Sequence, residues 1–263
     1  MTTALNSDKI LFGLPNLEGH LADRAIMAET SRTKLPEDPA PGGWTAQKQI
    51  DAIKRRMIRQ GTLAIGMLEA SLDALWSIDA EVAMHVREQD SAIDTEEVRI
   101  EEECYQILAL QQPVARDFRV LAFVLKVNHD IERVADHASS ISKVAMKLAA
   151  LPVVPKFPTG LRELGERVPA TCHKLLRAML EEDVAAARQI VLDDKLLDKL
   201  DKGSYAELTK SLAHKGEDDI AAGLLLYRVG RELERVGDLM KNIAEDVVYL
   251  GTGEIVRHAK HQK

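Results

Sequence analysis

Apolar residues recur every three or four positions over most of the chain beyond residue 44, which is the spacing of amphipathic helices. Turn-forming residues divide this pattern into six segments. We therefore predict six helices, over residues 45–77, 79–110, 114–149, 161–180, 183–214 and 218–250. Thr45, Asp79 and Asp183 are suited to begin three of them, because their side-chain oxygens can accept hydrogen bonds from the free N–H groups of a first helical turn.

The third and sixth predicted helices match at a shift of 102 residues, and the second and fifth at a shift of 104. A period near 100 residues indicates a duplicated domain and not a solenoid. The predicted fold is all-α, with two tandem three-helix bundles related by internal duplication, over residues 44–150 and 159–251. The apolar stripe of the first helix consists of Ile50, Ile53, Met57, Leu63, Met67 and Leu75.

Three further segments lack the helical pattern. Residues 1–43 end in a stretch rich in Pro and Gly, so we expect a mobile N-terminal extension and linker. Residues 151–158 contain three prolines, which favours an extended connection between the two repeats. Residues 252–263 form a C-terminal tail.

Composition and charge exclude several classes of protein. The 42 acidic residues outnumber the 35 basic ones and no basic run occurs, so we expect no nucleic-acid partner. No apolar stretch approaches the about 20 residues that a membrane helix needs, and the N-terminus does not resemble a signal peptide. We therefore expect a cytoplasmic protein without direct membrane insertion. Cys104 and Cys172 are predicted to be small buried apolar residues.

Four pairs of acidic residues with i, i+4 spacing recur at matched positions of the two repeats. They are Asp90/Asp94, Glu132/Asp136, Asp194/Asp198 and Glu234/Asp238. Residues with this spacing share one helical face, with Cβ atoms about 5–6 Å apart, and each pair borders an apolar stripe. If the second and third helices of each repeat are neighbours, four carboxylates converge on one edge of each bundle.

Converging carboxylates with no basic residue among them need a cation. Oxygen ligands suit hard ions such as Fe³⁺, Mg²⁺, Mn²⁺ or Ca²⁺, and Zn²⁺ is also possible. We therefore predict that the eight paired residues are metal ligands. Residues in the same segments could orient the glutamates, namely Asp130, Arg133, Glu232 and Arg235.

The acidic pairs also have alternative interpretations. Chance alone gives roughly six or seven such pairs in a chain this acidic, so one pair by itself is better explained as a solvated helix face. A carboxylate-bridged metalloenzyme is a further alternative, but the Glu-x-x-His motif of di-iron enzymes is absent. No catalytic or nucleotide-binding motif is present, so we predict that the protein is not an enzyme. His129 and His137 are interpreted as partly exposed helix residues.

The acidic segments resemble motifs of a known family. Residues 130–136 (Asp-Ile-Glu-Arg-Val-Ala-Asp) and 232–238 (Glu-Leu-Glu-Arg-Val-Gly-Asp) are similar to the paired signature of the PhoU family. Residues 90–94 and 194–198 match its other acidic motif, and residues 111–119 and 253–258 resemble its inter-helix turn and its C-terminus. The resemblance covers residues 44 to about 258, and the long N-terminal extension departs from it.

This resemblance implies a cytoplasmic regulator of phosphate uptake and of phosphate-regulon signalling. The implied partners are the ATPase of the Pst phosphate ABC transporter and a PhoR-type sensor kinase, and the implied assembly is a homodimer. The resemblance also implies metal clusters at the acidic motifs, of iron or zinc, with Mg or Mn possible. An accessory of a different phosphate carrier is the alternative within the same family.

Overall fold

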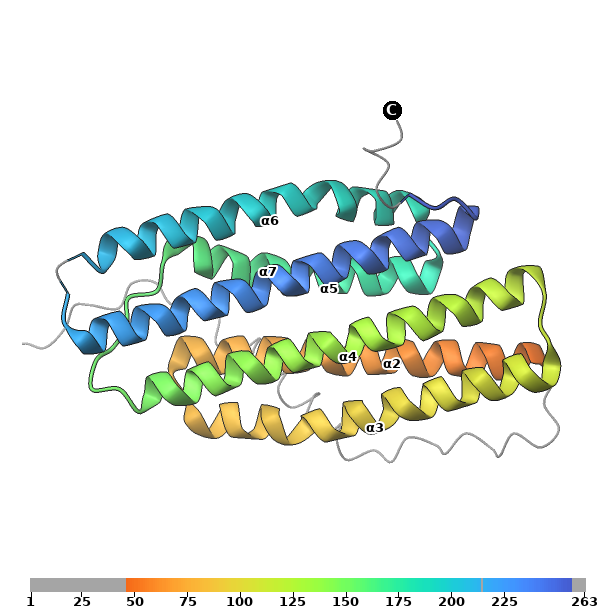
Figure 1. Cartoon of the computed structure of the whole chain (residues 1–263), viewed down its shortest axis with the longest axis horizontal. Helices are drawn as coiled ribbons and strands as arrows, with labels where there is room; N and C mark the ends of the chain where they lie inside the picture. Colours follow the sequence, from red (N-terminus) through yellow and green to blue (C-terminus); the bar gives the residue numbers. More distant parts are fainter. Residues whose placement is uncertain (1–45, 214, 257–263) are drawn as a thin grey trace, which may run out of the picture. The chain divides into compact units, whose positions relative to one another are not determined.

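Six long helices follow one another along the chain in the computed structural model, which describes residues 46–213 and 215–256 (Figure 1). Their bounds are α2 Ala46–Ser77, α3 Ala80–Gln111, α4 Ala115–Ala149, α5 Thr159–Glu181, α6 Val184–Ser211 and α7 Glu217–Thr252. No strand occurs in these described ranges. The predictions for residues 1–43, for the Thr45 cap and for residues 257–263 of the tail lie outside them.

The two predicted aspartate caps are confirmed. Asp79 accepts hydrogen bonds from the N–H groups of Glu81 and Val82 at 2.9 and 3.1 Å, and so begins α3. Asp183 begins α6 in the same way, accepting from the N–H groups of the second and third residues that follow it. Each cap follows a residue in the left-handed region, Ile78 (φ 54°) or Glu182 (φ 53°). The duplicated sequence therefore produces the same turn in both repeats.

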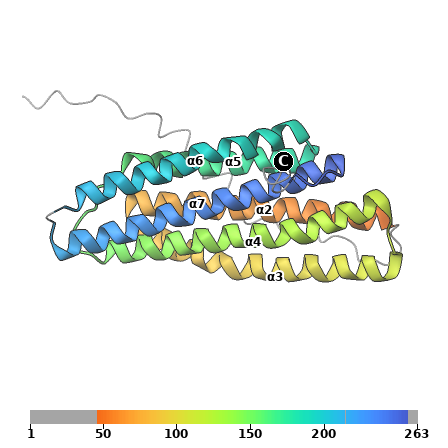
Figure 2. The same ribbon diagram turned by 45° about the horizontal axis from the view of Figure 1, so that its top comes forward.

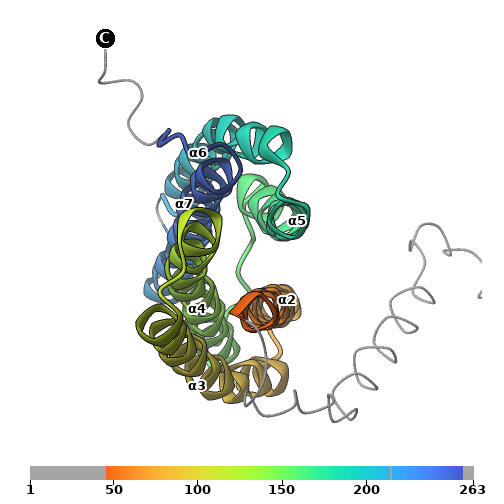
Figure 3. The same cartoon turned by 90° about the vertical axis from the view of Figure 1, so that its right-hand side faces the viewer.

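Helices α2, α3 and α4 pack on one another as the first repeat, and α5, α6 and α7 pack as the second. The repeats meet through two contacts, α4 against α7 and α2 against α5. Figures 2 and 3 show the helices running alongside one another, with α3 and α6 on opposite outer sides. The fold class predicted from the sequence is therefore confirmed for the described residues.

The buried face of α2 differs from its predicted stripe at one position. Leu63 is exposed, whereas the small or polar residues Gln60, Gly61 and Ala64 face the interior. A Cβ on Gly61 would lie 2.9 Å from a methyl carbon of Leu176 in α5, so the close approach of the two repeats leaves no room for a large side chain there. The remaining stripe positions of α2 are buried as predicted.

The connection between the repeats packs against the first one. The ring of Phe157 meets Trp76 edge to face with centroids 5.1 Å apart, and the Arg162 guanidinium lies over both rings. Helix α5 begins at Thr159, two residues before the predicted start at Leu161, because Thr159 and Gly160 are not part of the apolar pattern. This contact fixes where α5 starts beside α2.

Both cysteines are buried free thiols, as predicted. Burial raises the pKa of Cys104 and of Cys172 to about 12. Within residues 46–213 and 215–256, the helices are too polar or too short in their apolar runs to cross a membrane.

Candidate metal centres

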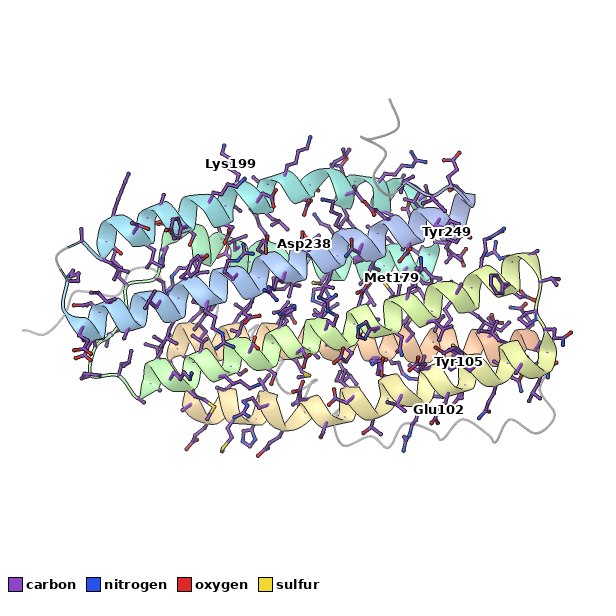
Figure 4. All side chains as sticks on the ribbon, viewed as in Figure 1. Glu102, Tyr105, Met179, Lys199, Asp238 and Tyr249 are labelled. Atoms are coloured by element: carbon purple, nitrogen blue, oxygen red, sulfur yellow. The ribbon has the colours of Figure 1, made fainter. Side chains whose placement is uncertain are left out.

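The paired helices of each repeat bring acidic residues together at their contact. In the first repeat they come from the middle of α3 and of α4, and in the second from α6 and α7. The first acidic cluster consists of Asp90, Asp94, Glu97, Glu132 and Asp136. The second acidic cluster consists of Asp194, Asp198, Asp201, Glu234 and Asp238. Figure 4 labels Asp238 midway along α7.

Electrostatic effects show that the first acidic cluster spans both helices. Burial raises the pKa of Asp90, and the charges of Asp136 and Asp94 raise it further, against a hydrogen bond with Ser139 that lowers it. Burial also raises the pKa of Glu132, with Asp136 adding to the effect. Oxygen Oδ1 of Asp90 is buried and accepts no hydrogen bond in the described part of the chain. Asp90 and Glu132 are partly buried, whereas Asp94 and Asp136 are exposed, so the repulsion acts at the border between the packed helices and solvent.

The second acidic cluster has the same layout. Burial raises the pKa of Asp238, and the negative charges of Asp194 and Asp198 raise it further. Burial raises the pKa of Glu234 as well. Asp194 is the most buried member of either cluster, with 9% of its surface exposed. The predicted convergence of carboxylates thus occurs in both repeats.

The prediction that no basic residue stands among the carboxylates is wrong for the second acidic cluster. The ammonium of Lys241 donates to Oδ2 of Asp194 at 2.6 Å, and this hydrogen bond raises the pKa of the lysine. The guanidinium of Arg231 lies 3.2 Å from Glu234 and 3.7 Å from Asp201. The contacts of Lys241 with Asp194 and of Arg231 with Asp201 join α7 to α6, so sequence spacing could not show them, whereas Arg231 and Glu234 have i, i+3 spacing within α7.

Glu97 and Asp201 were missed as cluster members. Each follows the second aspartate of its motif by three residues, and the two match at the 104-residue shift that relates α3 to α6. The signal was therefore present as an i+3 position on the same helical face. Basic side chains lie near both of them: His129 lies 3.8 Å from Glu97, and Arg231 occupies the corresponding place beside Asp201.

The residues expected to orient the glutamates are placed differently. Arg133 is exposed and its ion pair goes to Asp130, at 3.7 Å, and Arg235 is also exposed. Glu232 turns away from the cluster to accept a hydrogen bond from Arg228. The expected orienting role of these four residues stays a prediction.

The interpretation of His137 as partly exposed is wrong. Its side chain is 10% exposed, and Nδ1 lies 2.7 Å from a carboxylate oxygen of Glu232 across the contact between α4 and α7. His129 is exposed, as expected, and lies 3.6 Å from Glu132. His137 is therefore part of the contact between the repeats, which a sequence match within each repeat cannot reveal.

The donor set of the first acidic cluster fits a hard metal ion. Its carboxylates supply only oxygen ligands, and the buried Asp90 Oδ1 is a ready acceptor. As the side chains are oriented, no three His, Cys, Asp or Glu residues in the described ranges already stand in a metal-binding arrangement. Coordination therefore requires the carboxylates to rotate about their side-chain bonds toward a common ion.

Comparison with known proteins agrees with the duplicated architecture. The PhoU domain matches residues 57–145 and again residues 161–247, one match in each repeat. The chain belongs to the PhoU family. Both matches contain the acidic residues of their repeat, so each cluster lies within a PhoU domain.

Relatives and solved structures cover most of the chain. A PhoU homologue of Deinococcus radiodurans, named a phosphate-specific transport system accessory protein, is 35% identical over 72% of this chain and 92% of its own length. A homologue of the same name from a Burkholderia species is 30% identical over 80% of this chain and 89% of its own.

The crystal structure of PhoU from Pseudomonas aeruginosa superimposes with a TM-score of 0.77 at 30% identity, covering 80% of this chain and all of that one. The phosphate transport system regulatory protein PhoU from Streptococcus pneumoniae gives a TM-score of 0.72 at 27% identity, over 81% of this chain and 99% of its own.

Proposed function

We propose that this protein is a cytoplasmic regulator of phosphate uptake and phosphate-regulon signalling, acting through protein–protein contacts and not as an enzyme. The observation that supports the proposal is the match of a PhoU domain to each three-helix repeat, in a chain whose relatives are named accessory proteins of phosphate-specific transport. The partners proposed are the ATPase of the Pst transporter and a PhoR-type sensor kinase, and the assembly proposed is a homodimer.

Deletion of the gene tests the regulatory role. In cells that lack it, a phosphate-regulon promoter should be active even when phosphate is plentiful, because the signal that represses the kinase is lost. A plasmid copy of the wild-type gene should restore repression. Full repression in the deletion strain at high phosphate would refute the proposal.

We also propose that the acidic clusters bind metal ions, with iron or zinc first and Mg or Mn as the other options. The support is the donor set: several partly buried carboxylates per cluster, with pKa values that burial and mutual repulsion raise. A bound cation would relieve this repulsion. The bound ion would supply positive charge that holds α3 to α4, while the carboxylates of this chain supply its ligands.

Elemental analysis of the purified protein tests metal binding. Asp90→Ala/Asp94→Ala protein should contain less metal than wild type, whereas Glu102→Ala should match wild type, because Glu102 is an exposed residue elsewhere on α3 (Figure 4). Equal metal content in the double variant and wild type would remove the first-repeat site.

A further inference from the structure

The two acidic clusters differ in the groups that stand beside matched carboxylates. At the 102-residue shift Ser139 corresponds to Lys241, and His129 corresponds to Arg231. The first cluster therefore contains a neutral hydroxyl and an imidazole where the second contains two permanent cations. The carboxylates themselves correspond one to one, so the clusters differ in the residues beside them.

Lys241 already occupies the most buried acceptor of the second cluster. Its ammonium donates to Asp194 at 2.6 Å, a charge-assisted hydrogen bond of short length. In the first cluster the matching Asp90 is hydrogen-bonded by Ser139, while its Oδ1 is buried without a hydrogen-bond partner in the described residues. Oε2 of Glu234 in the second cluster is also buried without a hydrogen-bond partner in the described residues, but it lies 3.2 Å from the guanidinium of Arg231. The clusters therefore differ in the cations that contact their carboxylates, and not in the presence of a buried oxygen.

Arg231 joins the remaining carboxylates of the second cluster. It reaches Glu234 at 3.2 Å and Asp201 at 3.7 Å, so one guanidinium is shared between α6 and α7. His129 has the same position in the first cluster, at 3.6 Å from Glu132 and 3.8 Å from Glu97, but its side chain is 64% exposed, against 40% for Arg231. An exposed imidazole can turn into solvent, whereas a shared guanidinium balances the charge that a metal would otherwise balance.

The first cluster has one further cation nearby. Lys143 is exposed on α4, and its charge affects Asp90 less than Ser139, Asp136 and Asp94 do. Its counterpart in the second repeat is Glu245, whose negative charge acts on Lys241, so this position reduces the difference in net charge between the two clusters. The asymmetry between the clusters therefore lies in the direct contacts that Lys241 and Arg231 make with carboxylates of the second cluster, and not in the number of charges nearby.

We infer that the protein has one hard-cation centre and not two. The first acidic cluster binds metal, whereas in the second acidic cluster Lys241 and Arg231 pair with the carboxylates and so prevent metal binding. This inference rests on the metal binding proposed above. A divalent ion entering the second cluster must displace Lys241 from Asp194 and then remain close to two positive charges. We expect its affinity there to be at least ~100-fold weaker than in the first cluster.

Equilibrium dialysis of the chelator-stripped full chain against Mn²⁺, and against Fe²⁺ without oxygen, tests the inference by counting bound metal. Asp90→Asn/Asp94→Asn should abolish binding, and the matched variant Asp194→Asn/Asp198→Asn should leave the stoichiometry of wild type unchanged. Circular dichroism checks that each variant is folded. An equal loss of metal in both double variants would overturn the inference while leaving metal binding in place.

Exchanging the residues beside the carboxylates between the two clusters gives a second, independent test. Ser139→Lys should lower the affinity of the first cluster by about 100-fold, and Lys241→Ser/Arg231→His should raise the stoichiometry by adding the second centre. If Ser139→Lys binds metal as tightly as wild type, counter-cations do not decide which cluster binds metal, and the inference is wrong. If wild type itself binds neither ion, the proposal of metal binding is wrong. This result differs from the one expected if both clusters bind metal equally, in which case wild type binds metal and both double variants lose it.

Discussion

Asp79 and Asp183 each satisfy two backbone N–H groups at the start of a helix that carries half of an acidic cluster. Replacing either by alanine leaves these donors without a side-chain acceptor. We expect Asp79→Ala and Asp183→Ala each to lower the free energy of unfolding by about 1 kcal/mol, within a range of about 0.5–2 kcal/mol. Urea denaturation measures the change, with Glu102→Ala as a surface control. A loss no larger than that of the control would contradict the capping role.

Two helical glycines should respond to alanine with opposite signs. A Cβ on Gly165 would lie 2.5 Å from the ring of Trp76, which Phe157 and Arg162 hold in place, so Gly165→Ala should cost roughly 1–3 kcal/mol. A Cβ on Gly203 would meet nothing within 4 Å, so Gly203→Ala should stabilise α6 by about 0.5–1 kcal/mol. Thermal denaturation of both variants is the measurement. Equal shifts of the same sign would show that the α2–α5 contact is too loose to exclude a methyl group.

At the scale of elements, Glu182 connects the two repeats. Its carboxylate accepts from Lys54 of α2 at 2.7 Å and from Arg116 of α4 at 2.9 Å. Burial acts to raise the pKa of Glu182, but the hydrogen bond and charge of Lys54, together with Arg116, outweigh it and lower the pKa. The ionised carboxylate therefore favours the folded state.

The pH dependence of stability tests this contact. A carboxyl whose pKa is lower in the folded chain stabilises fully above its unfolded pKa of about 4.3, and this stabilisation is lost as the pH falls through the folded value. Glu182→Gln should lower stability at pH 7 by up to about 1 kcal/mol, and the difference from wild type should vanish in acid. The control is Glu181→Gln, at the exposed neighbouring residue. A difference that persists unchanged at pH 3 would show that the ion pairs are not its cause.

Much at the element scale follows from the sequence, because helical periodicity, aspartate caps and proline-rich breaks are local signals. The exposed Leu63 shows the limit of periodicity, since the close approach of α5 to Gly61 is a contact between distant segments. The pairing of His137 with Glu232 across α4 and α7 was equally inaccessible. The repeat predicted what each bundle contains and not how the bundles meet.

The candidate site was predictable to a similar degree. The eight paired carboxylates converge as the i, i+4 spacing indicated, and the i+3 position would have added Glu97 and Asp201. The contacts of Lys241 with Asp194 and of Arg231 with Asp201 were not found, because they depend on side-chain directions between two helices. Matched sequence motifs therefore concealed two clusters with different ion pairs.

At the scale of the whole molecule, the duplicated PhoU domain places one acidic cluster in each repeat. We propose that metal binding is part of the regulatory role. The contacts of Lys241 and Arg231 in the second cluster favour the first repeat as the place where the metal binds. Loss of the first cluster should then remove the regulatory state of the protein while leaving the fold, whose core lies along the apolar stripes, in place.

Phosphate-regulon promoter activity at high phosphate, in a deletion strain supplied with one variant at a time, tests this account most directly. Wild type and Glu102→Ala should restore full repression, and Asp90→Asn/Asp94→Asn, present at equal protein level, should leave the promoter active. Repression by the double variant as complete as that by wild type would contradict the account, because the first acidic cluster would then have no part in regulation.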